Sequence, residues 1–241
     1  MKLLFSIFII LGLVSCLEKG NSGSNQTPPP ATPNLITNAD LAGTWSTECV
    51  KDSSTTSSKQ VLKFEGATRT LTVTNYSDVN CTQPALETSE STTLTLGNIS
   101  ATDKDSQEIN IQYQNTTMTW KTSSGASGAN ILGMCGIYNW QANIATNISG
   151  KTCNGLRVSA NGETIYSIIS LDKTENPASI FQGKRDSYTG TSGTNRIYSL
   201  DLYFEFKKHS PTDTGGNGND TTTASWQSTS ATNAPAARAY H

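Results

Sequence analysis

Apolar and polar residues alternate one by one along most of the segment between residues 40 and 208. Residues spaced by two share one face of a β-strand, whereas an amphipathic helix repeats about every 3.6 residues. No part of this segment sustains the helical period. The clearest alternating runs are 70–74, 109–113, 118–120, 138–148 and 200–206. The pattern predicts an all-β domain of roughly eight to ten strands.

Short polar segments rich in Ser, Thr, Asn and Gly separate these runs, for example KDSSTTSSK, TSSGASG and DKTENPAS. Such connections favour antiparallel neighbours. Each predicted strand has a single apolar face, which a sheet buries either by closing on itself or by packing on a second sheet. Closure also removes unpaired edge strands. We therefore predict an antiparallel up-and-down β-barrel over residues 40–208, with a two-sheet β-sandwich as the alternative.

The chain starts with a hydrophobic leader, MKLLFSIFIILGLVSC. Lys2 precedes an apolar run that ends at Val14 and is shorter than the about 20 residues that a membrane-spanning helix needs. Such a run is typical of a signal peptide. Its end, LVSC at residues 13–16, resembles the lipobox of bacterial lipoproteins, in which the cysteine carries the lipid and becomes the first mature residue. The resemblance implies a signal peptide at residues 1–15 and lipid attachment at Cys16.

A lipid on Cys16 anchors a protein to a membrane without spanning it. Residues 16–39 are rich in Gly, Ser, Asn and Pro, which predicts a flexible and partly extended tether. Residues 209–241 contain too few apolar side chains to pack, which predicts a disordered polar tail. Leu17 follows the cysteine, whereas Asp in this place marks inner-membrane retention in enterobacterial lipoproteins. The resemblance therefore implies the outer membrane, with the domain in the periplasm or at the cell surface.

Cysteine usage agrees with an exported protein. The chain has five cysteines, and assigning Cys16 to the lipid leaves an even set for an oxidising compartment. The remaining four are Cys49, Cys81, Cys135 and Cys153. Three pairings are possible, and we favour Cys49–Cys81 with Cys135–Cys153 because both close local loops. No CxxC pair is present and no His precedes residue 209, so a zinc site is not expected.

The segment LAGTWSTEC at residues 41–49 contains Gly43-Thr44-Trp45, which resembles the G-x-W motif of lipocalin-type barrels. In those barrels the Trp closes one end and stacks on an Arg near the last strand. The resemblance implies that Trp45 and Arg196 form the barrel-closing pair. With the further segments YSDVNC and CGIYNWQANIATNISGKTC, the chain resembles lipocalin-like lipoproteins of Gram-negative bacteria over about residues 40–207.

The residues favour neither catalysis nor nucleic-acid binding. Residues 40–208 contain no His, which excludes Ser–His–Asp and Cys–His arrangements, so no enzyme activity is expected. Asp103, Asp105 and Glu108 form the densest acidic cluster, which we interpret as a solvated turn rather than a calcium site. No metal or other cofactor is expected. The net charge of −2 and the lack of a Lys/Arg cluster argue against a nucleic-acid partner.

Four aromatic residues fall on predicted inward faces, namely Trp45, Trp120, Tyr138 and Trp140. A barrel of about eight strands is wide enough either to pack solid or to hold one small ligand. Two functions therefore stay open. The first, which we prefer at this point, is a packed barrel that contacts envelope or extracellular proteins through loops such as 122–130 and 185–196. The second is a barrel that binds a small hydrophobic or amphipathic ligand against these aromatic residues.

Overall fold

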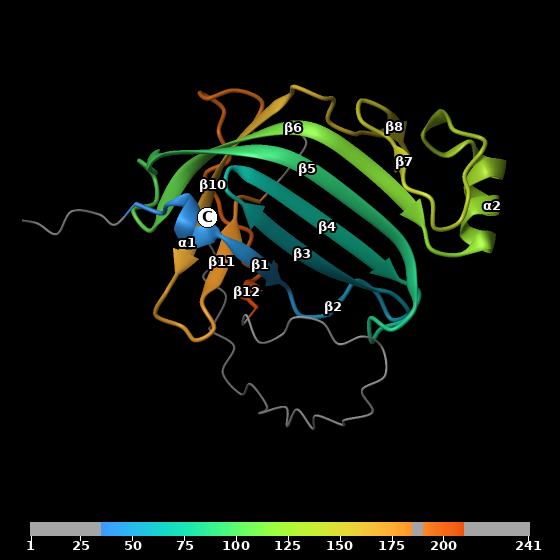
Figure 1. Ribbon diagram of the computed structural model, residues 1–241, viewed down its shortest axis with the longest axis horizontal. Coiled ribbons are helices and arrows are strands. Elements are labelled where there is room, and N and C mark those ends of the chain that lie inside the picture. The colour runs from blue at the N-terminus through green and yellow to red at the C-terminus, as the bar shows by residue number, and fades with distance from the viewer. Residues whose placement is uncertain (1–34, 185–189, 210–241) are drawn as a thin grey trace, which may run out of the picture. The chain divides into compact units, whose positions relative to one another are not determined.

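The computed structural model describes residues 35–184 and 190–209. The predicted signal peptide, Cys16 and the tail beyond residue 209 lie outside the described residues. Eight antiparallel strands form a closed barrel (Figure 1). In ring order these strands are β1 (Gly43–Ser46), β3 (Ser57–Glu65), β4 (Thr68–Tyr76), β5 (Pro84–Ile99), β6 (Ser106–Trp120), β10 (Thr164–Asp172), β11 (Ser179–Gln182) and β12 (Phe206–Lys208).

Strand β1 closes the ring because it pairs on both sides. Trp45 lies opposite Leu62 of β3 and opposite Lys208 of β12. Neighbours around the ring follow one another along the chain, apart from four short strands outside it. Two of these pair with ring strands, β2 (Val50–Lys51) with β3 and β7 (Thr146–Asn147) with β6, and the other two, β8 (Thr152–Cys153) and β9 (Leu156–Arg157), pair with each other. The up-and-down barrel is therefore confirmed, and the two-sheet alternative is not the fold.

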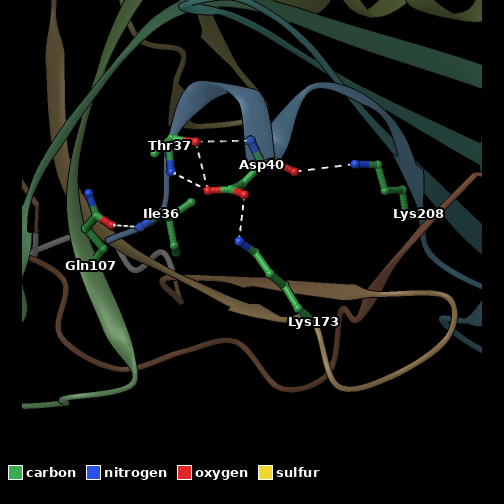
Figure 2. Close-up of polar contacts among 6 residues, drawn as sticks. All are labelled: Ile36, Thr37, Asp40, Gln107, Lys173 and Lys208. Carbon is green, nitrogen blue, oxygen red and sulfur yellow. Dashed lines mark hydrogen bonds and ion pairs between the residues drawn. The ribbon is translucent and has the colours of Figure 1, made fainter. Parts of the chain in front are cut away.

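A short helix, α1 (Asn38–Leu41), packs against one end of the barrel. Thr37 begins it with a capping box, in which the Thr37 hydroxyl accepts from the Asp40 amide and the Asp40 carboxylate accepts from the Thr37 amide (Figure 2). Leu41, at the end of the helix, is fully buried in the barrel core. Residues 35–39, which we assigned to the tether, thus fold against the barrel.

Three further contacts fix this N-terminal segment to strands far along the chain (Figure 2). The Ile36 amide donates to Gln107 Oε1 at 2.6 Å, Lys173 Nζ lies 2.6 Å from Asp40 Oδ1, and Lys208 Nζ donates to the Asp40 carbonyl at 3.4 Å. The hydrogen bond from Lys173, followed by those from Thr37, lowers the pKa of the Asp40 carboxyl to about 2. The carboxylate is therefore charged at neutral pH and keeps α1 on the barrel.

The apolar core occupies the barrel end next to α1. Trp45 is fully buried, and its Nε1 donates to the Leu41 carbonyl at 2.7 Å. The other buried members of this core are Leu41, Leu62, Phe64, Leu94, Ile109, Ile111, Ile169, Ile180 and Phe206. Because these residues come from α1 and from seven of the eight ring strands, this end of the barrel is packed solid.

A β-bulge in β6 changes which residues face inward. Tyr113 lies opposite Thr92 of β5, but Asn115 lies opposite Ser91, so Gln114 is an extra residue. Odd-numbered residues such as Tyr113 point into the barrel before the bulge, and even-numbered residues from Thr116 onward do so after it. This shift explains the change of phase between the alternating runs 109–113 and 118–120.

Residues 121–163 form a second region, which we call the outer unit, beyond the end of β6. Figure 1 shows it at the opposite end of β5 and β6 from α1. It has its own small core around Trp140 and Ile148. Its elements are α2 (Ser123–Leu132), the 3₁₀ helix η1 (Met134–Gly136), β8 (Thr152–Cys153) and β9 (Leu156–Arg157), together with β7. Among the described residues, no helix has the length and apolar character needed to cross a membrane.

Both favoured disulfides are confirmed. Cys49–Cys81 joins the segment after β1 to the connection between β4 and β5. Cys135–Cys153 joins η1 to β8 and lies in the core of the outer unit. Each bond therefore closes a local loop, as the pairing argument required.

The predicted strand over 138–148 is wrong. Only Thr146 and Asn147 pair with β6. The backbone of Trp140 forms hydrogen bonds with the Asn130 side chain of α2 and not with a neighbouring strand. The Asn130 side chain accepts from the Trp140 amide at 2.6 Å and donates to the Trp140 carbonyl at 3.0 Å. The TSSGASG segment, predicted as a turn, begins helix α2, with the Thr122 hydroxyl as its N-cap. These bonds and the disulfide fold the outer unit, against its alternating sequence pattern.

Candidate functional site

The barrel is packed at the α1 end and hollow in its other half. The hollow is a cavity of about 270 Å³, which we call the barrel cavity. Its walls combine apolar side chains with a few polar ones, a composition typical of small-molecule sites. The lining residues are Gln60, Arg69, Leu71, Val73, Glu90, Ile111, Tyr113, Ile165, Ser167, Gln182, Gly183, Asp201, Phe204 and Phe206.

A buried arginine is the main polar feature of the barrel cavity. Arg69 of β4 is only 4% exposed, and its Nε and Nη2 donate to Gln182 Oε1 at 3.1 and 2.8 Å. Gln182 belongs to β11, on a different side of the ring, so these hydrogen bonds cross the interior. A guanidinium is always charged, and arginine is rarely buried in a mostly apolar interior without such partners.

Two further polar groups lie at the far side of the barrel cavity. Tyr113 of β6 is buried, and its hydroxyl donates to Glu90 Oε2 at 3.5 Å. Glu90 of β5 lies opposite Leu71 on one side and opposite Thr116 on the other. The cavity thus offers hydrogen-bond donors and a carboxylate beside apolar walls, which suits a molecule with one polar and one apolar end.

Sequence reasoning missed Arg69, although the sequence contains the signal. Arg69, Leu71 and Val73 alternate along β4, and all three line the barrel cavity. The run 70–74 places Leu71 and Val73 on one apolar face, and the same period puts Arg69 on that face. A charged residue in phase with an apolar run is therefore the feature to look for.

The four aromatic residues predicted to line a ligand site do not share one cavity. Trp45 lies in the packed end, and Trp140 lies in the core of the outer unit. Trp120 is on the inward face of β6 but beyond the bulge, where its ring meets Trp140 edge-on at 6.4 Å between centroids. Tyr138 is 73% exposed, because residues 137–145 are not a strand. None of the four lines the barrel cavity.

The expected stacking of Arg196 on Trp45 is also wrong. The cation beside Trp45 is Lys208, whose Nζ lies 4.9 Å from the ring centroid. Lys208 is the register partner of Trp45 in the last strand, β12, which spans only Phe206–Lys208. The alternating run 200–206, predicted as a strand, is therefore not one, since β12 begins only at Phe206.

Arg196 instead holds β6 and β10 together from outside the barrel. Its Nη1 donates to the carbonyls of Ile109 and Ser167 at 2.6 and 2.9 Å, and its guanidinium lies 5.5 Å from the centre of the Tyr166 ring. The chain around it runs along β10, since the Ile197 amide donates to the Tyr166 carbonyl at 3.0 Å. Of the predicted interaction loop 185–196, residues 185–189 lie outside the described residues.

The acidic cluster after β5 serves the local turn. Asp103 accepts hydrogen bonds from the Asp105 amide at 3.1 Å and from the Ser106 hydroxyl at 2.6 Å. Glu108 lies 3.5 Å from Arg196, on the outer face. In the two described stretches of the chain, no group of three or more His, Cys, Asp or Glu side chains is arranged to hold a metal ion.

The fold and the cavity define a class of molecule, an eight-stranded antiparallel barrel that is packed at one end and hollow at the other. Compared with protein families and with curated proteins, the chain matches no family model and no curated sequence.

Proposed function

We propose that the protein is a lipid-anchored protein of the bacterial envelope whose barrel binds a small amphipathic molecule. The barrel cavity is the observation that supports binding over the solid barrel that we preferred from the sequence. Its volume of about 270 Å³ is close to the lower end of typical ligand sites, about 300 Å³. The lipobox resemblance at residues 13–16 supports the lipid anchor.

The arrangement of the walls suggests how such a molecule lies. Its apolar part packs against Leu71, Val73 and Phe204, and its polar end faces Arg69 and Tyr113. A charge-assisted hydrogen bond from a buried guanidinium is stronger than one between neutral groups. We therefore expect a ligand with an acceptor oxygen at its polar end, such as a carboxylate.

Decanoate is a suitable probe for this function, with isothermal titration calorimetry as the measurement. Val73→Phe places a ring in the barrel cavity and is expected to weaken decanoate binding at least about tenfold. Thr74→Phe, on the opposite face of β4, is the matched control and should bind decanoate as the natural chain does.

Arg69→Met tests the polar end of the site. It should weaken the binding of decanoate about tenfold and leave the binding of decanol unchanged. If Val73→Phe and Thr74→Phe bind equally, the barrel cavity is not the site.

Lipid attachment is proposed from the leader, and it has its own test. Replacing Cys16 with alanine should prevent lipid attachment and release the protein from the membrane fraction, since no acyl chain then remains to hold it. The measurement is fractionation of cells that express the chain, together with the mass of the processed N-terminus. A normally processed and still membrane-bound Cys16→Ala protein is the result that contradicts the lipobox assignment. The outer membrane is proposed on the same resemblance, through Leu17.

A further inference from the structure

A second pocket, which we call the outer pocket, lies beyond the barrel cavity where β5 and β6 extend past the ring. Its volume is about 430 Å³, and it lies between the inward face of these strands and residues 134–159 of the outer unit. The β6 bulge creates it, because the bulge turns the side chains of residues 116, 118 and 120 inward beyond Tyr113. Its apolar lining includes Leu86, Met118, Trp120, Met134, Leu156 and Val158.

Two buried polar groups on residues that line the outer pocket lack hydrogen-bond partners. Thr116 is 1% exposed and lines the pocket, and its Oγ1 has no partner among the described residues. The same holds for Nε1 of Trp120, which is buried although the ring borders the pocket. Buried polar groups in folded proteins are almost always paired, so each such group calls for an explanation. One explanation is a bound molecule that supplies the missing hydrogen-bond partners.

The chemistry of these groups defines what the molecule must carry. The indole N–H can only donate, and the threonine hydroxyl can donate through its single proton. Both therefore match acceptor oxygens. The two residues are four apart on one extended strand, so they lie at different positions along the outer pocket. The methionines beside them adapt their shape to apolar ligands of different outline.

We propose that the outer pocket is a second binding site, for an elongated apolar molecule with acceptor oxygens such as ester carbonyls at two positions. The site does not depend on the proposed function of the barrel cavity. Only Glu90 lines both spaces. The polar face of the ligand meets Thr116 and Trp120, and its chain packs on Met118 and Met134.

Dimethyl suberate, a linear diester, is the probe for this proposal. The experiment uses the full chain with Cys16→Ala, exported to an oxidising periplasm, and records the indole N–H signals by ¹⁵N NMR during titration. The Trp120 signal should shift with saturation, and the Trp45 signal should not, because Trp45 Nε1 is already bonded to the Leu41 carbonyl. No shift of the Trp120 signal up to the solubility limit of the diester overturns the proposal.

A pair of isosteric variants separates ligand binding from structure. Thr116→Val removes the unpaired hydroxyl and should weaken the diester about five- to tenfold while raising the melting temperature. Thr117→Val, on the opposite face of β6, is the matched control and should bind normally. Equal affinity in the two variants, or a lower melting temperature for Thr116→Val, counts against the proposal. Val73→Phe should leave diester binding unchanged, so the outer pocket is tested separately from the barrel cavity.

Discussion

Replacing Trp45 with alanine is expected to lower the free energy of unfolding by about 4 kcal/mol. The indole is fully buried at the α1 end, where it packs within the barrel core and donates to the Leu41 carbonyl at 2.7 Å. Alanine leaves a cavity there and removes the hydrogen bond from the indole to Leu41 of α1. It also removes the ring face that Lys208 covers at 4.9 Å. We expect α1 to loosen together with the barrel end.

Urea unfolding followed by far-ultraviolet circular dichroism measures this loss. Trp45→Phe is the control, since it keeps most of the buried ring and loses the hydrogen bond to Leu41, and it should destabilise the domain by about 2 kcal/mol. Trp140→Phe makes the same substitution in the core of the outer unit, so its effect on the free energy of unfolding can be compared with that of Trp45→Phe. A loss below about 1 kcal/mol in Trp45→Ala contradicts the role of Trp45 as the centre of the packed end.

The barrel could be predicted because its strands are governed by one physical rule. Each strand has a solvent-facing outer side and a buried inner side. Polar and apolar residues therefore alternate with a period of two along the sequence. The same rule extends to Arg69, whose inward position follows from Leu71 and Val73. The rule fails at residues 138–148. Polar and apolar residues alternate there, but hydrogen bonds from the Asn130 side chain fix the backbone of Trp140 outside a strand. Tertiary hydrogen bonds of this kind have no local signature.

The partner of Trp45 was mispredicted for a related reason. An Arg near the last strand was expected, which pointed to Arg196, whereas the structure places the cation Lys208 over the Trp45 ring. Which of them meets Trp45 depends on where the final strand begins and on its register with β1. Before Phe206, Ile197 bonds to Tyr166 of β10, and residues 199–201 bond to residues 182–184 without forming a strand. Register follows from the closure of the whole barrel, which no short motif records.

One disulfide stabilises the barrel, and the other stabilises the outer unit. Cys135 and Cys153 are 18 residues apart, and Cys49 and Cys81 are 32 apart. In the chain-entropy model, removing either bond is expected to lower the free energy of unfolding by about 3 to 4 kcal/mol. The part of the protein that loses stability should differ between the two bonds, because Cys135–Cys153 lies within the small separate core of the outer unit.

We expect the double variant Cys135→Ala and Cys153→Ala to unfold the outer unit locally while the barrel persists. The barrel keeps its closed ladder of strands and its own core around Trp45, whereas the outer unit has only short strands, one α-helix and one short 3₁₀ helix. Hydrogen exchange measures this directly, since amides of residues 123–158 should lose protection and those of β4 to β6 should keep it. The double variant Cys49→Ala and Cys81→Ala is the matched control and should leave the protection of the outer unit in place. If the Cys135 and Cys153 variant instead loses protection evenly across the barrel, the two cores form one cooperative unit. In that case the outer pocket could not open without unfolding the barrel cavity beside it.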